Sequence, residues 1–137
     1  MKFGTSVKFV KAQFVSEGGP VARILGPEDI ANIYKRDIAT RPEYDCEVEQ
    51  FSAMYLDTRN NCKAAAVVTK GTLNASLVHA REVFRPAIAC GAAAIAVCHN
   101  HPSGETSPSP EDLQVTRDLI AAGKILGIKV LDHVKHK

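Results

Sequence analysis

A run of small apolar residues that ends in a histidine places the strongest constraint on how this chain can fold. Residues 92–98 read AAAIAVC, and the run stops at His99. A short, uninterrupted apolar segment of this kind is typical of a strand that is covered on both faces of its sheet. We therefore expect a buried strand over residues 92–98, followed by a polar loop.

The length and composition fit a single folded domain. The chain has 137 residues, of which 45% are hydrophobic and 23% charged, which suits about one domain with a modest core. No segment predicts a transmembrane helix, and the first 14 residues lack the apolar stretch of a signal peptide, so we expect a cytoplasmic protein with no membrane partner. The four cysteines contain no C-x-x-C pair, which favours reduced thiols, with Cys90 and Cys98 buried.

Turn residues and hydrophobic patterning divide the chain into several strands. Strands are predicted at residues 7–15, 21–25, 49–57, 62–68, 92–98 and 128–134. The segment GGP at residues 18–20 ends the first of them, and a polar turn joins the third and fourth into a hairpin. Together with about three helices, these strands predict a mixed α/β domain.

Three segments have helical spacing. The first begins with Pro27 at the N1 position and ends near Thr40. The second covers residues 81–92, where Pro86 requires the first turn to lie close to it. The third covers residues 109–127 and ends at a glycine.

The third helix has the clearest start signal in the chain. Ser109 is placed as its N-cap, and Asp112, at the N3 position, completes a capping-box pattern. This structural role is by itself a sufficient reason for both residues. One side of the helix is defined by apolar and long side chains at helical spacing, namely Leu113, Thr116, Ile120 and Lys124.

Two histidines after the buried strand are candidate metal ligands, together with a later aspartate. Side chains at positions i and i+2 of an extended chain point the same way, so His99 and His101 can converge at one end of the sheet. The polar loop then returns the chain so that Asp112 can approach them. Two imidazoles and a carboxylate are a common catalytic zinc set, with a fourth position for water. The competing interpretation is a pair of solvated histidines in a surface loop.

The spacing of these residues resembles a known metalloprotease signature. The pattern His99-x-His101-Pro102-x(6)-Ser109-x(2)-Asp112 is similar to the JAMM motif of the JAB/MPN domain superfamily. Further segments resemble the RadC family in the same order: GTLN at 71–74, VHAREVF at 78–84, HNHPSG at 99–104, PS at 108–109 and DH at 132–133. The resemblance covers roughly residues 26–134.

The resemblance implies a fold, a metal and an activity. We expect the JAB/MPN (cytidine-deaminase-like) fold, an α/β (α+β) arrangement, over residues 28–137, truncated at its C-terminal end and preceded by a strand-like extension at residues 1–27. Both histidines and the aspartate bind zinc in this superfamily, so His99, His101 and Asp112 are expected to hold one Zn²⁺ per chain. The implied reaction is cleavage of an amide bond in a peptide or isopeptide by zinc-activated water.

The superfamily also uses an upstream glutamate, at the beginning of a strand, as general acid and base. Glu49 matches this position because it lies at the beginning of the predicted strand, just before the segment FSAMYLD at residues 51–57. Glu47 is an alternative on the same face of an extended chain. Glu82 is a third candidate, although its place at a helix start beside Arg81 also suits dipole or ion-pair stabilisation.

Four further residues receive expected roles beside the metal. In the family pattern Ser109 donates a hydrogen bond to the oxyanion of the tetrahedral intermediate. Asn100 points away from the histidines in an extended chain and is expected to fix the loop. Asp132 and His133 are candidates for supporting a ligand imidazole from behind.

A non-catalytic or DNA-repair-associated module is the alternative function, because the RadC name implies a history in DNA repair. A formal net charge of +2, scattered basic residues and no stacking aromatics give DNA association weak support. A metal nuclease would need its residues widely spaced on a ββα unit, and a zinc deaminase needs the absent H-x-E and P-C-x-x-C motifs. The sequence leaves the substrate and the oligomeric state open.

Overall fold

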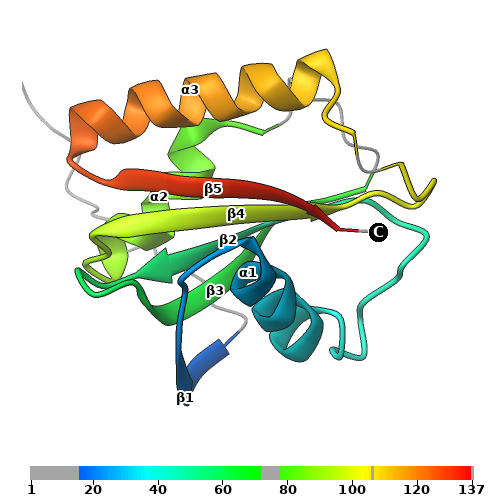
Figure 1. Cartoon of the computed structure of the whole chain (residues 1–137), viewed down its shortest axis with the longest axis horizontal. Helices are drawn as coiled ribbons and strands as arrows, with labels where there is room; N and C mark the ends of the chain where they lie inside the picture. Colours follow the sequence, from blue (N-terminus) through cyan, green and yellow to red (C-terminus); the bar gives the residue numbers. More distant parts are fainter. Residues whose placement is uncertain (1–15, 72–77, 106, 137) are drawn as a thin grey trace, which may run out of the picture.

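Five strands form one central sheet in the computed structural model, which describes residues 16–71, 78–105 and 107–136. The strands are β1 (Ser16–Arg23), β2 (Gln50–Leu56), β3 (Asn61–Lys70), β4 (Ala94–Asn100) and β5 (Lys129–His136). Their order across the sheet is β1-β3-β2-β4-β5, with β5 parallel to β4 and the other neighbouring pairs antiparallel (Figure 1). The prediction of a mixed central sheet is confirmed.

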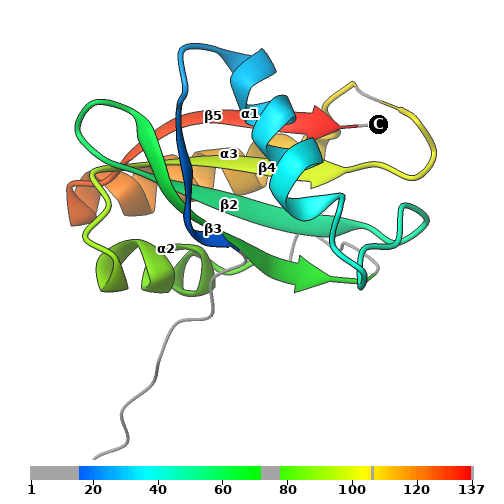
Figure 2. The same ribbon diagram turned by 90° about the horizontal axis from the view of Figure 1, so that it is seen from below.

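Helices cover both faces of this sheet. They are α1 (Pro27–Ile33), which continues into the π-helical turn η1 (Tyr34–Ile38), α2 (Ala80–Ala89) and α3 (Pro110–Leu126). Helices α2 and α3 lie against one face and α1 against the other (Figure 1, and from below in Figure 2). The prediction of about three helices is confirmed, but the second differs in detail: Pro86 lies inside α2, which tolerates the loss of one backbone hydrogen bond.

Strand β4 is shared by two hydrophobic cores. All of its residues are buried. Ile95 and Val97 pack with apolar residues of α2 and α3, whereas Ala96 and Cys98 pack with those of α1. The prediction of a strand covered on both faces is therefore confirmed, and its alanines let the layers approach closely.

Strand β4 continues further than predicted, to Asn100 instead of stopping at His99. The backbone of His99 is paired with Phe51 of β2 on one side and with Lys135 of β5 on the other. Because both neighbouring strands extend this far, hydrogen bonding to them keeps the polar end of β4 extended. For the same reason β5 continues to His136, past its predicted end.

Strand β1 contains the glycine and proline segment that was predicted to end a strand. It lies at an edge of the sheet, and its register against β3 shifts between Glu17 and Ala22. The predicted break at residues 18–20 is wrong, because an edge strand can accommodate glycine and proline at an irregularity of this kind. The strand predicted at residues 7–15 lies outside the described residues.

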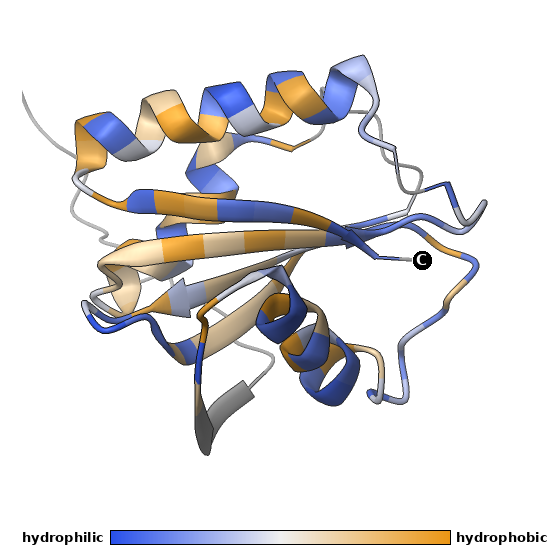
Figure 3. Ribbon diagram, in the orientation of Figure 1, coloured by the Kyte–Doolittle hydropathy of each residue, from blue (hydrophilic) through white to orange (hydrophobic). Residues whose placement is uncertain are grey.

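Helix α3 buries a different side from the one that its spacing of apolar and long side chains defines in the sequence. Its buried residues are Val115, Leu119 and Gly123, whereas Leu113 and Ile120 are 46% and 39% exposed. Hydrophobic positions recur among hydrophilic ones along the whole helix (Figure 3). The buried residues and the exposed apolar residues therefore both have helical spacing. Contact with the sheet selects one of them, which spacing alone does not reveal.

Two further predictions concern the state of the cysteines and a transmembrane helix. The four cysteines are free, as expected; Cys98 is buried, but Cys90 is only partly buried, so its predicted burial is not met. Of the helices in the described ranges, none combines the length and the apolar composition that crossing a bilayer requires.

We predict that Gly123→Ala destabilises the fold. A Cβ at Gly123 would overlap the carbonyl oxygen of Ile128, to which α3 comes close before β5 begins. Alanine gains about 1 kcal/mol in helix propensity, but displacing packed backbone costs about 1–3 kcal/mol, so we expect a net loss of up to about 2 kcal/mol in the free energy of unfolding. Urea denaturation measures this. The matched control is Gly26→Ala, where the added Cβ meets nothing within 4 Å; equal stabilities of the two variants would contradict the close approach.

Candidate metal centre

The candidate site lies where the end of β4 meets the first turn of α3 and the segment before β2. His99 and His101 lie at and just after the end of β4, Asp112 is in the first turn of α3, and Glu49 directly precedes β2. The exposed side-chain fractions are 4% for His99, 22% for Asp112, 26% for His101 and 20% for Glu49. The structure thus brings together four of the residues that the sequence singles out.

The four side chains form two facing pairs. His99 Nε2 lies 3.4 Å from Asp112 Oδ1, and His101 Nε2 lies 3.3 Å from Glu49 Oε1. The two imidazole ring centres are 6.2 Å apart, and all four residues line one cavity of about 260 Å³. Within the described ranges, no three His, Cys, Asp or Glu side chains are arranged so that they could hold one metal ion as they stand. The arrangement is two histidine–carboxylate pairs that share a cavity.

Both histidines turn Nε2 toward a carboxylate, while Nδ1 contacts a neighbouring side chain. His99 Nδ1 is 2.8 Å from Nε2 of His133, and His101 Nδ1 is 2.7 Å from Oγ of Ser103. Each ring is therefore oriented through Nδ1, and each Nε2 faces the cavity. This is the usual arrangement of metal-binding histidines, whose second nitrogen is held by a neighbouring group.

The Nε2 atom of His99 is buried and has no hydrogen-bond partner. Buried polar atoms without a partner are rare in folded proteins and call for a structural or functional reason. A metal ion that accepts the nitrogen lone pair would satisfy this atom. The donor set of His99, His101 and Asp112 is also one that zinc prefers, so the residues present fit a zinc ion.

Burial keeps the imidazole of His99 neutral. Its ring stacks against Phe51 at a centroid distance of 6.1 Å, and His133 packs edge-on against the same phenyl ring. Burial, assisted by His133, lowers the pKa of His99 to about 4, although Asp112 acts in the opposite direction. Burial also lowers the pKa of His133. A neutral imidazole is the form that binds a metal ion.

The two oxygens of Asp112 have different surroundings. Oδ2 accepts hydrogen bonds from the backbone N–H of Ser109 at 2.9 Å and from Nζ of Lys135 at 3.1 Å, while Oδ1 faces His99. Burial alone would raise the pKa of Asp112, but the bonds from Ser109 and Lys135 lower it to about 2. The carboxylate is therefore ionised, and capping the helix leaves one oxygen turned to the cavity.

Asn100 holds Glu49 in place from both sides. Its Oδ1 accepts a hydrogen bond from the backbone N–H of Gln50 at 2.6 Å, and its Nδ2 donates to the carbonyl of Val48 at 2.8 Å. The predicted loop-fixing role of Asn100 is confirmed. Since these contacts flank Glu49, they fix the backbone of this residue relative to the end of β4, where His99 and His101 lie.

The rival glutamates do not line the cavity that contains both histidines. Glu47 is exposed, and it lines a neighbouring cavity of about 420 Å³ together with Glu49 and His101. Glu82 forms ion pairs with Arg85 at 3.3 Å and with Arg81 at 3.8 Å on α2, as its stabilising role predicts. Of the three candidates, Glu49 is the one that lines the cavity with both histidines.

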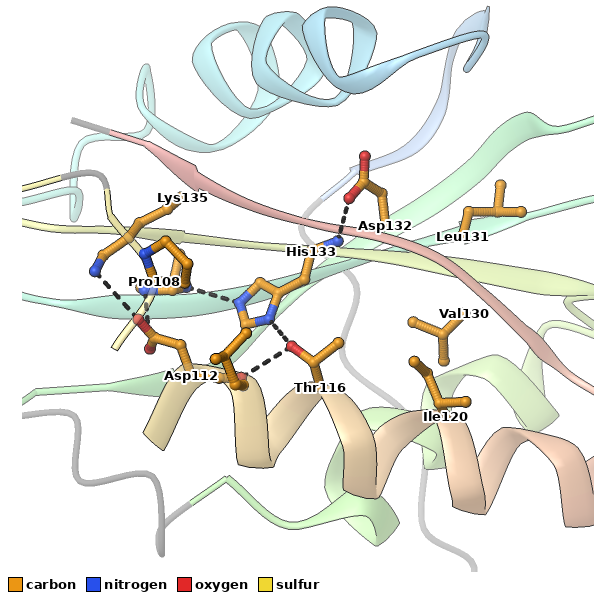
Figure 4. Close-up of a pocket in the computed structure, with 11 residues that line it drawn as sticks. Pro108, Asp112, Thr116, Ile120, Val130, Leu131, Asp132, His133 and Lys135 are labelled. Carbon is orange, nitrogen blue, oxygen red and sulfur yellow. Dashed lines mark hydrogen bonds and ion pairs between the residues drawn. The ribbon is translucent and has the colours of Figure 1, made fainter. Parts of the chain in front are cut away.

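Asp132 and His133 lie in two different environments. His133 contacts His99, as expected of a supporting residue, whereas Asp132 Oδ1 accepts the backbone N–H of His133 and lies on the opposite side of β5 (Figure 4). The predicted support from Asp132 is therefore not seen. Figure 4 also shows Lys135 and Thr116 turned toward this region, beside a cavity of about 310 Å³ between α3 and β5.

Sequence reasoning missed Lys135 and Thr116. Lys135 lies two positions after His133 on β5, so the alternation of a strand could have placed it on the same side. Thr116 follows Asp112 by one helical turn, and this spacing was a usable signal.

Comparison with known proteins identifies the family of this chain. A model of the family described as RadC-like JAB domain matches residues 24–134. The chain is 44% identical over 108 residues to a UPF0758 protein of Finegoldia magna, covering 79% of this chain and 46% of the relative. It is 44% identical over 122 residues to one of Methanosarcina acetivorans, covering 88% and 50%, and 39% identical over 134 residues to UPF0758 protein TTE0897 of Caldanaerobacter subterraneus, covering 98% and 55%.

The chain spans about half the length of these curated relatives. The match to the family nevertheless covers β2, β3, β4, most of β5 and all three helices, and it includes Glu49, His99, His101 and Asp112. The chain therefore belongs to the family of RadC-like JAB domains.

Proposed function

We propose that this domain is a zinc-dependent hydrolase that cleaves an amide bond in a peptide-like substrate. The observation that carries the proposal is the buried Nε2 of His99, which has no hydrogen-bond partner and faces the ionised Asp112 beside the His101–Glu49 pair. Membership of the JAB domain family, some of whose members are hydrolases, supports the same reaction class.

Three residues would hold the ion. His99 and His101 present Nε2, and Asp112 presents Oδ1, the oxygen that the helix cap does not use. When bound, zinc supplies Lewis-acid chemistry, because it polarises a carbonyl oxygen and increases the acidity of water.

In this proposal Glu49 acts as the general base and then as the general acid. Its carboxylate lines the same cavity as the histidines, and Asn100 fixes the backbone on both sides of it. A carboxylate in this position accepts a proton from the attacking water and returns it to the leaving nitrogen, so that the amine departs neutral.

In the same proposal Ser109 stabilises negative charge on the substrate oxygen. Its Oγ accepts the N–H of Asp112 at 3.1 Å as helix cap, and its side chain lines the cavity. A hydroxyl has one proton and two lone pairs, so the cap leaves that proton for donation to a developing oxyanion.

We expect the purified protein to bind about one zinc ion per chain, as a site with three protein ligands requires. His99→Ala and His101→Ala should each abolish stoichiometric binding, because each removes a ligand. The matched control is His79→Ala, which changes an exposed histidine at the start of α2. Elemental analysis after zinc loading and desalting measures the content. Equal zinc in His99→Ala and wild type would refute the site.

Removing zinc should leave a protein that is sensitive to acid. The pKa of His99 is about 4 in the folded state and 6.5 ordinarily, so between these values the unfolded state binds the extra proton. The free energy of unfolding of the zinc-free protein should therefore fall with decreasing pH across this window, by about 3 kcal/mol from His99. Asp112, with its pKa lowered from 3.8 to about 2, adds a further loss only below this window.

Urea denaturation of the zinc-free protein at a series of pH values measures the effect. His99→Gln should show a shallower fall than wild type, whereas His79→Gln should match wild type. A fall of the same size in His99→Gln would show that His99 is not the group responsible.

Glu49→Gln should lose hydrolysis but keep zinc, since Glu49 acts on water and is not needed as a ligand. We expect turnover of a mixed library of fluorogenic peptide amides to drop about 10²–10⁴-fold. Glu47→Gln and Glu82→Gln are the matched controls and should keep wild-type rates. Full turnover by Glu49→Gln with loss in Glu47→Gln would transfer the role to Glu47.

A further inference from the structure

A series of hydrogen bonds connects the two candidate ligands His99 and Asp112 through side chains of β5 and α3. His99 Nδ1 is 2.8 Å from His133 Nε2, and His133 Nδ1 is 2.7 Å from Thr116 Oγ1. Thr116 Oγ1 in turn is 2.9 Å from the backbone carbonyl of Asp112, one helical turn earlier (Figure 4). The series begins at one ligand and ends at the backbone of another.

The last bond in the series fixes the direction of all the others. A carbonyl oxygen only accepts, so the single hydroxyl proton of Thr116 is donated to Asp112. Thr116 then accepts from Nδ1–H of His133. A neutral His133 that carries its proton on Nδ1 has a lone pair on Nε2, which accepts from Nδ1–H of His99. His99 is left with its lone pair on Nε2.

Hydrogen bonds donated in the opposite direction, from Thr116 to His133 and from His133 to His99, would disagree with two observations. They would place a hydroxyl lone pair of Thr116 against the carbonyl of Asp112, two acceptors at 2.9 Å. They would also place a proton on Nε2 of His99, facing Asp112 Oδ1, yet the structure shows no hydrogen bond from this nitrogen. The direction that Thr116 sets is the one that leaves His99 able to bind a metal ion.

We propose that Thr116 and His133 are positioning residues that hold His99 in its Nδ1–H tautomer and thereby set the affinity of the site for zinc. This inference rests on the proposed zinc site, but neither residue is a ligand in that proposal. Groups that support a ligand in this way typically contribute 10-fold to 100-fold to metal affinity.

Thr116→Val tests the proposal with little change of shape. Valine keeps the branched side chain and removes the hydroxyl, so Nδ1 of His133 loses its acceptor. We expect zinc affinity, measured by competition with a chromophoric chelator, to fall about 10-fold to 100-fold. Thr116→Ser keeps the hydroxyl and should restore wild-type affinity.

Thr69→Val is the matched control. The hydroxyl of Thr69, on β3, is buried and has no hydrogen-bond partner, so its removal should leave zinc affinity unchanged. Unfolding curves of all three variants show whether a loss of affinity reflects a loss of folding.

Imidazole nitrogen NMR of the protein with ¹⁵N-labelled histidine provides a second readout. In the zinc-free wild type, Nδ1 of His99 and of His133 should have pyrrole-like shifts, and both Nε2 atoms pyridine-like shifts. In Thr116→Val this pattern should be replaced by a mixture of tautomers at His99. In Thr116→Ser it should be kept.

Two results would overturn the inference. The first is equal zinc affinity of the wild type and of Thr116→Val, in a wild type that does bind zinc. The second is a pyrrole-like shift of Nε2 in His99 or His133 of the zinc-free wild type. If the wild type takes up no zinc, the proposed function fails and the affinity claim with it, whereas the nitrogen shifts still decide the direction of the hydrogen bonds. The two failures are therefore distinguishable.

Discussion

The parallel pairing of β4 with β5 is the interaction on which the candidate site depends. It continues to Asn100 and His136, and it keeps His99 in an extended strand between two neighbours. The same register places His133 beside Val97 and Lys135 beside His99. Each of these β5 residues then contacts a candidate ligand: His133 contacts His99, and Lys135 contacts Asp112. A one-residue slip would turn them to the other face of the sheet.

The elements that could be predicted from the sequence are those whose signal is local. The apolar run of β4 identifies a doubly covered strand, and Ser109 with Asp112 identifies the start of α3 by side-chain chemistry that operates within one turn. The spacing of His99 and His101 similarly placed both rings at one end of the sheet. These inferences needed no knowledge of which elements pack together.

The elements that could not be predicted depend on partners distant in the sequence. The end of β4 is set by the lengths of β2 and β5, and the buried face of α3 is set by the sheet beneath it. Thr116 and Lys135 were missed for the same reason, because their contacts with His133 and Asp112 exist only after β5 has paired. Local spacing made them possible candidates but gave no means of selecting them.

The clamp formed by Asn100 has a consequence for how the centre assembles. Because Asn100 bonds to both neighbours of Glu49, the carboxylate of Glu49 and the two histidines at the end of β4 belong to one preorganised unit, whose conformational entropy is lost during folding. Asp112 belongs to a different element, and its 3.4 Å separation from His99 is set by how α3 docks on the sheet. A change in the distance between Asp112 and His99 therefore requires a change in the seating of one helix, while Glu49 stays fixed relative to the histidines.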